Sequence, residues 1–280
     1  MSATWQKVRL GDLIELKRGY LPTAHRRPGP YPVISSSGPT GYHADAIVDG
    51  PGVVTGRYGT IGDVFFAKGS FWPLNTALYV RDFKGNEPRF IYYFLKTLDW
   101  SKFNDKSGVP GVNRNHAHQE PVYVPAYQEQ VDIANKLFVL DEKIELNDHK
   151  ASTLEEVAQA LYRSWFVDFD PVKAKAEGRE TALMDSATSA LFPDRFSEKG
   201  LPQGWGLGKL SDIFDFNPKE RLPKGSVAPY IDMKALPTRG LTTEPPFRRE
   251  FKSGTKFRDG DTLLARITPC LENGKTGLVD

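Results

Sequence analysis

The stretch QEQVDIANKLFVLDEKIELNDHKASTLEEVAQALYRSWFVD, from Gln128 to Asp168, decides the fold of this chain. Its apolar side chains recur in alternating steps of four and three residues, the heptad pattern of a helix that packs along a two-position seam. Neither glycine nor proline interrupts it, so the sequence predicts one helix of about 40 residues, roughly 60 Å long at 1.5 Å per residue. The seam consists of Ile133, Leu137, Leu140, Ile144, Asn147, Ala151, Leu154, Ala158, Leu161 and Trp165.

A long helix cannot bury such a seam by itself, so the pattern predicts a partner helix, with self-association as one possibility. Ala151 and Ala158 would let the partner approach closely, and Asn147 is a polar group of the kind that fixes register. An ordinary core helix of a globular domain is the alternative, but core helices rarely keep a strict seam over about four heptads.

Charge is distributed unevenly along the chain. Residues 1–125 carry 15 Lys and Arg against 10 Asp and Glu, residues 126–170 carry 4 against 10, and residues 171–280 carry 18 against 15. Two basic regions therefore flank an acidic rod, which points to a polyanionic partner for the ends and not for the rod. The single Cys270 excludes an internal disulfide and a cysteine-based zinc site. With no signal peptide or bilayer-length apolar run, the sequence predicts a cytoplasmic protein without a membrane partner.

Residues 1–125 are predicted to form an α+β domain. One helix is expected from Pro88 to about Trp100, and basic and polar loops, including Lys106–His116, connect the elements. Short runs of β-type composition, bounded by Gly and Pro residues, are predicted to be strands. They are Val8–Leu16, Tyr31–Ser35, Val53–Thr55, Asp63–Phe66, Ala77–Val80 and Val122–Val124.

After the rod of residues 126–170 and a linker of residues 171–204, the sequence repeats itself. Trp5 and the Leu10–Leu13 segment reappear as Trp205 and Leu210–Ile213 at the same spacing, and Asp49-Gly50 is echoed by Asp259-Gly260. Residues 205–280 are therefore predicted to be a diverged and incomplete second copy of the first domain. We expect this chain to be a truncated form of one near 400 residues, a rough figure that assumes two full copies.

The chain resembles the specificity subunit of type I restriction–modification systems. The resemblance covers the whole chain, and the order of its motifs is as informative as each motif singly. It rests on Trp5 with Val8–Asp12, Gly56–Gly62, Val109–Asn113, Val124–Ala134 and, most specifically, Trp165–Arg179.

The resemblance implies two target recognition domains of twisted β-sheet and short helices, joined by a long heptad-repeat helix. Each domain would read one half of a split DNA sequence. The subunit would hold two methyltransferase subunits and join restriction or translocase subunits. S-adenosylmethionine, ATP and Mg²⁺ are expected in those partners, and no cofactor or metal in this chain, which would catalyse nothing itself.

Arg, Lys, Asn, Ser and Thr on Gly-rich loops can hydrogen-bond base edges, while other cations neutralise phosphates. For each predicted contact the alternative is a solvated surface side chain, and for Arg57 it is a structural ion pair. The predicted DNA contacts of the first domain are Lys17, Arg18, Tyr20, Arg26, Arg27, Ser36, Arg57, Tyr58, Thr60, Asn113 and Arg114. Their counterparts in the second domain are Lys219, Arg221 and Arg266.

Enzyme motifs are absent from the sequence. Gly274-Lys275-Thr276 hints at a phosphate-binding loop, but that pattern requires glycine where Pro269 stands. Two functions stay open: a sequence-specific DNA-binding specificity subunit, and a truncated scaffold that dimerises or holds methyltransferase subunits through its helix without reading DNA.

Overall fold

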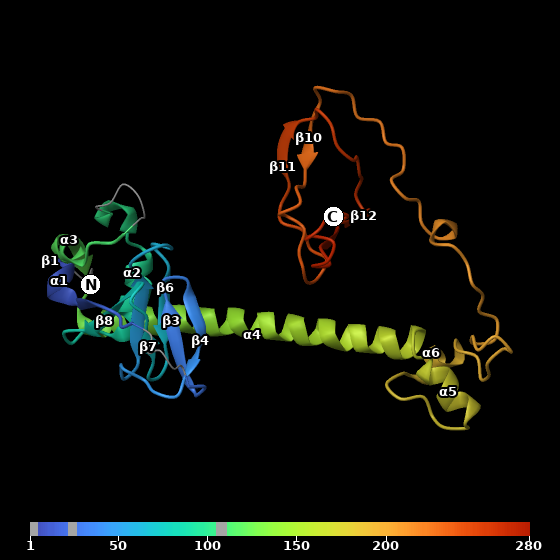
Figure 1. The fold of residues 1–280 in the computed structure, drawn as a ribbon, viewed down its shortest axis with the longest axis horizontal. Coiled ribbons are helices and arrows are strands. Elements are labelled where there is room, and N and C mark those ends of the chain that lie inside the picture. Colours follow the sequence, from blue (N-terminus) through green and yellow to red (C-terminus); the bar gives the residue numbers. More distant parts are fainter. Residues whose placement is uncertain (1–4, 22–26, 105–110) are drawn as a thin grey trace. The chain divides into compact units, whose positions relative to one another are not determined.

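The predicted long helix is present as α4, which runs for 40 residues from Tyr127 to Phe166 (Figure 1). It belongs to a computed structural model that describes residues 5–21, 27–104 and 111–280. The chain divides into two units, Met1–Asp148 and His149–Asp280, and the division falls within α4. Each unit is described by itself.

In the described part of the first unit, the strands form two larger sheets and one separate pair. The larger is antiparallel with the order β2-β8-β5-β6, and the smaller has the order β4-β3-β7, in which β3 and β7 are parallel. The strands of the larger sheet are β2 (Glu15–Arg18), β5 (Gly52–Gly56), β6 (Val64–Ala67) and β8 (Ala77–Asp82). Those of the smaller are β3 (Tyr31–Ser35), β4 (Gly38–His43) and β7 (Trp72–Pro73). Separately, β1 (Gln6–Arg9) pairs with β9 (Pro121–Val124), just before α4.

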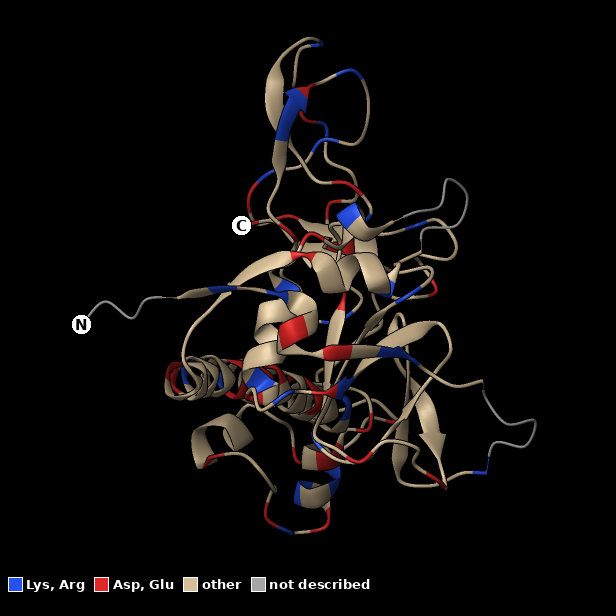
Figure 2. Cartoon of the chain, turned by 90° about the vertical axis from the view of Figure 1, so that its left-hand side faces the viewer, with Lys and Arg blue, Asp and Glu red and all other residues tan. Residues whose placement is uncertain are grey.

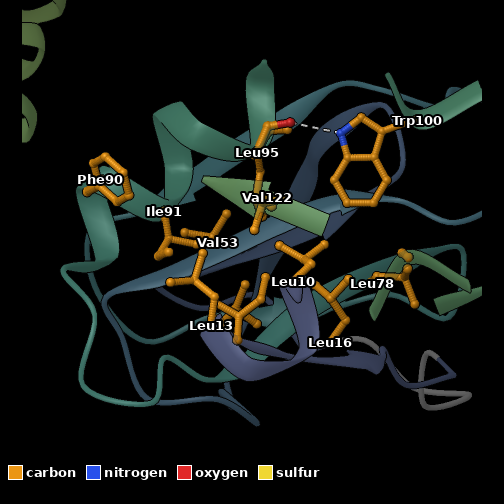
Figure 3. Close-up of a cluster of buried hydrophobic side chains, with 14 of the residues drawn as sticks. Leu10, Leu13, Leu16, Val53, Leu78, Phe90, Ile91, Leu95, Trp100 and Val122 are labelled. Atoms are coloured by element: carbon orange, nitrogen blue, oxygen red, sulfur yellow. Dashed lines mark hydrogen bonds between the residues drawn. The ribbon is translucent and has the colours of Figure 1, made fainter. Parts of the chain in front are cut away.

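Both faces of the larger sheet are covered, which explains its nearly continuous apolar strands. Val53 and Leu78 point into a core shared with the helices, whereas the neighbouring Val54 and Tyr79 point into a second cluster with Ile34 of β3. Figure 3 shows the first core, where the indole N–H of Trp100 donates to the carbonyl of Leu95 at 2.9 Å.

Short helices cover the first core: α1 (Leu10–Leu13), α2 (Pro88–Lys96), the 3-10 turn η1 (Trp100–Phe103) and α3 (Arg114–Gln119). The predicted β-run Val8–Leu16 is wrong in its middle, because α1 interrupts it. There the N–H of Arg9 donates to the Asp12 carboxylate at 3.2 Å, which caps the helical turn. The end of the predicted loop Lys106–His116 is likewise helical, since α3 begins at Arg114.

A buried glutamine fixes the first turn of α4 to the rest of the unit. The Gln130 amide accepts from the N–H of Glu87 at 3.1 Å and donates to Asn86 Oδ1 at 2.8 Å and to the Pro125 carbonyl at 3.1 Å. Further along α4, the Tyr93 hydroxyl donates to Asp141 at 2.8 Å. Figure 1 shows α2 and β6 beside these turns.

Replacing Gln130 with leucine is expected to lower the free energy of unfolding by about 2 kcal/mol, because it leaves buried partners unpaired at similar volume. Urea denaturation measures the change. Gln128→Leu is the matched control, since Gln128 is exposed and its side chain bonds Asp132 alone among the described residues. Equal stability of the two variants would show that the Gln130 hydrogen bonds contribute nothing net.

The middle of the predicted seam is open. Leu140, Ile144 and Leu154 are 59%, 57% and 68% exposed, and Asn147, Ala151 and Ala158 are exposed beside them. Of the remaining seam residues, Ile133, Leu137, Leu161 and Trp165 are half-buried. Ile133 packs against the first core, so only the start of the seam contacts the core of the first unit.

The second unit holds small elements in addition to its part of α4. They are α5 (Asp170–Ala176), α6 (Ser186–Ala190), the 3-10 turn η2 (Leu210–Asp212), and two antiparallel pairs: β10 (Val227–Tyr230) with β11 (Phe247–Glu250), and β12 (Thr262–Leu264) with β13 (Thr276–Leu278). Lys275 donates to the carbonyls of Met233, Lys234 and Leu236 at 3.0, 3.3 and 2.8 Å. The lysine of the rejected phosphate-loop motif therefore stabilises a turn of the chain.

The sequence repeat is visible in local structure. The N–H of Lys209 donates to Asp212 at 2.9 Å, as the N–H of Arg9 does to Asp12. Burial differs between the copies, because Leu210 is exposed whereas its counterpart Leu10 is fully buried. In the described part of the chain, no helix combines the length and apolarity that a membrane crossing requires.

Candidate nucleic-acid interface

Five of the predicted DNA contacts meet at one pocket in the first unit. We call it the arginine pocket; its volume is about 320 Å³. Its lining residues are Arg18, Arg57, Tyr58, Leu78, Gly111, Val112, Asn113, Arg114 and Asn115.

Strand ends bring these residues together. Arg18 ends β2 and Arg57 directly follows β5, and β8 lies between these two strands. The N–H groups of Arg57 and Tyr58 both donate to the Thr76 carbonyl, at 2.9 and 3.0 Å. The N–H of Val112 donates to the Arg57 carbonyl at 2.9 Å, which places the start of α3 and its Arg114 at the same end of the sheet.

Glycines allow the tight turn that carries Arg57. A Cβ atom on Gly56 would lie 1.8 Å from the carbonyl oxygen of Thr60, so no other residue fits there without backbone movement. Gly59 has φ +81°, a conformation that L side chains rarely adopt. The Gly56–Gly62 motif is therefore a turn that presents the side chains of Arg57 and Tyr58.

The guanidinium of Arg57 is held in a fixed position. Its central carbon lies 4.2 Å from the centroid of the Tyr58 ring, and its nitrogens donate to the Tyr58 hydroxyl at 3.2 Å and to the Asn75 carbonyl at 3.4 Å. Within the described part of the chain Arg57 forms no ion pair, so the structural ion pair considered for it is not found.

Positive charge accumulates in the arginine pocket. Partial burial lowers the pKa of Arg57, and the neighbouring charges of Arg18 and Arg114 lower it further. Arginine remains protonated despite such shifts, so repulsion among the three positive charges destabilises the folded protein. An anion at the pocket would relieve that repulsion.

Lys17 and Tyr20 form a separate group. Successive residues of a strand point to opposite faces, so the side chain of Lys17 points away from that of Arg18. Lys17 lies 5.8 Å from the centroid of the Tyr20 ring, and the Tyr20 hydroxyl lies 3.2 Å from that of Tyr79. This hydrogen bond and Lys17 lower the pKa of Tyr20, whereas burial raises the pKa of Tyr79.

The remaining predicted contacts are dispersed. Arg27 forms an ion pair with Asp45 at 2.9 Å, Ser36 is buried beside the Gly59 turn, and Thr60 is exposed. Arg26 lies outside the described residues. In the second unit Lys219, Arg221 and Arg266 are all exposed.

Asn115 lines the pocket but was not predicted. Its N–H donates to the side chain of Asn113 at 3.0 Å, which caps α3. The available signal was the Asn113-Arg114-Asn115 run, in which Asn113 and Arg114 were predicted as DNA contacts but neither the helix cap nor the second amide was recognised.

His118 fastens α3 to the strand that carries Arg18. Its Nε2 accepts from the N–H of Leu16 at 2.9 Å, so this nitrogen must be unprotonated in the folded protein. Burial lowers the pKa of His118, the positive charges of Arg114 and Lys84 lower it further, and Glu15 opposes them.

Acidification is therefore expected to destabilise the first unit through His118. Below the ordinary histidine pKa of about 6.5, the unfolded chain takes up a proton that the folded chain does not, so the free energy of unfolding falls as the pH decreases. Urea denaturation between pH 7 and 5 measures the slope. His118→Gln should flatten it, and His116→Gln, at an exposed position of the same helix, should not. An unchanged slope in His118→Gln would refute the assignment.

The fold and the pocket define a class of protein: an α+β module with a cationic pocket, carried on a long helical arm. A family model described as "Type I restriction modification DNA specificity domain" matches residues 2–156, more than half of the 280 residues. The chain belongs to the type I restriction modification DNA specificity domain family.

Relatives agree with this assignment. The type I restriction enzyme HindI specificity subunit of Haemophilus influenzae is 31% identical in an alignment of 173 residues, and the match covers 45% of this chain and 38% of that protein. The MjaIX specificity subunit of Methanocaldococcus jannaschii is 27% identical in an alignment of 184 residues, and the match covers 63% of this chain and 38% of that protein. The chain thus spans 38% of the length of either relative.

A solved structure shares the fold. The S subunit of a type I restriction–modification system from M. genitalium superposes with a TM-score of 0.50 at 15% sequence identity, over 99% of this chain and 70% of that chain. The predicted α+β class, with a long helix, is confirmed.

Proposed function

We propose that this chain is a sequence-specific DNA-binding specificity subunit of a type I restriction–modification complex. It would direct methyltransferase and nuclease subunits to a bipartite DNA target. Because its partner would be DNA, we expect the protein in the cytoplasm. The observation that carries the proposal is the arginine pocket, in which separate strand and helix ends present three arginines together.

The pocket has the chemistry of a DNA contact. A guanidinium presents a rigid fork of donors that matches a phosphate or the O6 and N7 atoms of guanine. Arg57 is restrained by Tyr58 and Asn75, which suits base reading. Arg18 and Arg114 are exposed cations, which suits contacts with the phosphates.

The partners follow from the same proposal. The open seam of α4 would pair with a second helix, including that of another copy of the chain, and the complex would hold two methyltransferase subunits and restriction or translocase subunits. S-adenosylmethionine, ATP and Mg²⁺ would be bound by those partners and none by this chain, whose role would be recognition without catalysis.

The exposed seam also favours a second candidate, a scaffold that dimerises or holds methyltransferase subunits without reading DNA. Selection from DNA duplexes with a randomised central segment separates the two candidates. A specificity subunit enriches a defined sequence, with an affinity that falls steeply with salt. Salt-dependent binding without enrichment, together with tight partner binding, would favour the scaffold and contradict the first proposal.

A further inference from the structure

The ribbon formed by β10 and β11 carries an arginine stacked on a tyrosine. The guanidinium carbon of Arg249 lies 3.5 Å from the centroid of the Tyr230 ring. In the antiparallel register Arg249 is opposite Ala228, and Tyr230 is opposite Phe247. Because alanine has no side chain beyond Cβ, the guanidinium can lie along the ribbon over the diagonal tyrosine.

Alternation gives the ribbon two chemically different faces. Tyr230, Phe247 and Arg249 share one face, whereas Arg248 and Glu250 point to the other. The Tyr230 and Phe247 rings are in edge contact, with centroids 5.2 Å apart, and Phe247 is exposed. The first face therefore presents a cation on an aromatic platform, with no carboxylate from either strand.

Positive charge in this domain is concentrated around the ribbon; Figure 2 colours Lys and Arg blue, including those of β11. Residues 224–258 carry eight Lys and Arg against three Asp and Glu, a net charge of +5. Residues 205–223, which include the predicted contacts Lys219 and Arg221, have a net charge of 0. Residues 259–280, which include Arg266, have a net charge of −2.

We propose that the β10–β11 ribbon enters the DNA major groove with its Tyr230–Arg249 face toward the bases, and that Arg249 binds a guanine edge. This inference rests on the proposed DNA-binding function and assigns a base contact to the second unit. The major groove is wide enough for a two-stranded ribbon, and the arginine fork matches guanine O6 and N7. Stacking on Tyr230 orients the fork before binding, which reduces the ordering cost.

The first unit supplies a parallel. Arg57 also lies over a tyrosine, Tyr58, at 4.2 Å. The position equivalent to Arg57 in the repeat is Arg266, but its neighbour is Ile267, so no aromatic platform follows it. The second unit thus provides the same pair from a different element.

The same fork could instead bind a phosphate, and the substitution of Arg249 distinguishes the two. Alanine removes the whole side-chain contact: loss of a phosphate contact weakens binding at every sequence alike, whereas loss of a guanine contact removes the preference at one position. Lysine keeps the charge and can still donate to guanine, but it lacks the rigid fork of arginine, so it should retain part of a guanine preference. Arg248→Ala is the matched control, since it removes the same charge from the adjacent position on the other face of the ribbon.

The test is selection by the full chain from DNA duplexes with a randomised central segment, carried out with wild type, Arg249→Ala, Arg249→Lys and Arg248→Ala. We expect Arg249→Ala to lose the preference for one guanine by roughly 10- to 100-fold, and Arg249→Lys to lose part of it, while the other selected positions stay. Arg248→Ala should keep every preference and bind slightly more weakly at all sequences. Circular dichroism confirms that each variant is folded.

The outcomes separate this inference from the proposed function. If wild type enriches a sequence and Arg249→Ala enriches the same one, Arg249 reads no base and the inference is overturned. An Arg249→Ala protein that binds more weakly at all sequences but keeps every preference would identify a phosphate contact and overturn the inference equally. If wild type enriches nothing, the proposed function itself fails.

Discussion

Arg57→Ala is expected to weaken binding to the selected duplex by roughly 10- to 100-fold, equivalent to about 1–3 kcal/mol for one bidentate base contact. Arg57 is the most restrained cation of the arginine pocket, since Tyr58 and the Asn75 carbonyl hold it and no acidic side chain of the described residues neutralises it. Fluorescence anisotropy with labelled duplex at constant salt measures the loss.

Two controls show what the loss means. Arg57→Lys retains the charge but lacks the rigid fork, so it should recover phosphate attraction and only part of the base discrimination. Arg27→Ala removes a cation that is already paired with Asp45, so its effect should be small. Affinity in a folded Arg57→Ala protein equal to that of wild type would remove Arg57 from the interface.

Leu140→Lys is expected to abolish pairing of α4 with a second copy of the helix. Burial of a leucine contributes about 1.5–3 kcal/mol, and a symmetric pair loses two such contributions and must also bury two charges. The dissociation constant should therefore rise by at least about 100-fold. Sedimentation of the full chain over a range of concentrations measures the change.

Val139 provides the control. It is adjacent to Leu140 and 63% exposed, against 59% for Leu140, but it lies outside the seam. Val139→Lys should associate as wild type does. Leu140→Lys protein that associates as strongly as Val139→Lys would show that the seam is not the pairing surface.

The long helix could be predicted from sequence because its signals are local. The heptad pattern acts over a few residues, as do Pro125 before the helix and Pro171 after it. The predicted Gln128–Asp168 therefore differs from the observed Tyr127–Phe166 by only one or two residues at each end. Helix α2 began at Pro88 as predicted for the same reason. The helix ends at Lys96 instead of Trp100. Trp100 is packed in the first core, where its indole N–H donates to the Leu95 carbonyl.

The arginine pocket could be predicted only as separate residues. Arg18, Arg57 and Arg114 lie far apart in sequence. Arg18 and Arg57 meet because β8 pairs with both β2 and β5. Arg114 joins them because the N–H of Val112 donates to the Arg57 carbonyl. Strand order is a long-range property that no local pattern specifies. For the same reason Lys17 was grouped with Arg18, although alternation sends their side chains to opposite faces.

The sequence also misled at short capped segments. The Val8–Leu16 run has β-type composition, but one aspartate cap turns its middle into α1. In the second unit, the stacking of Arg249 on Tyr230 could not be predicted, because it depends on the cross-strand neighbours Ala228 and Tyr230, which are about 20 residues away in sequence and belong to the other strand of the pair.

The two-sided packing of the larger sheet has a consequence for how such a protein can evolve. Val53, Val54, Leu78 and Tyr79 commit the interiors of their strands to two cores, whereas Arg18 and Arg57 emerge where the strands end. Substitutions at the ends disturb little of the buried packing, so new specificities can be sampled in a lineage without loss of folding. Under the proposed function, stability and DNA binding would be set by different residues of the same strands, and selection could act on each independently.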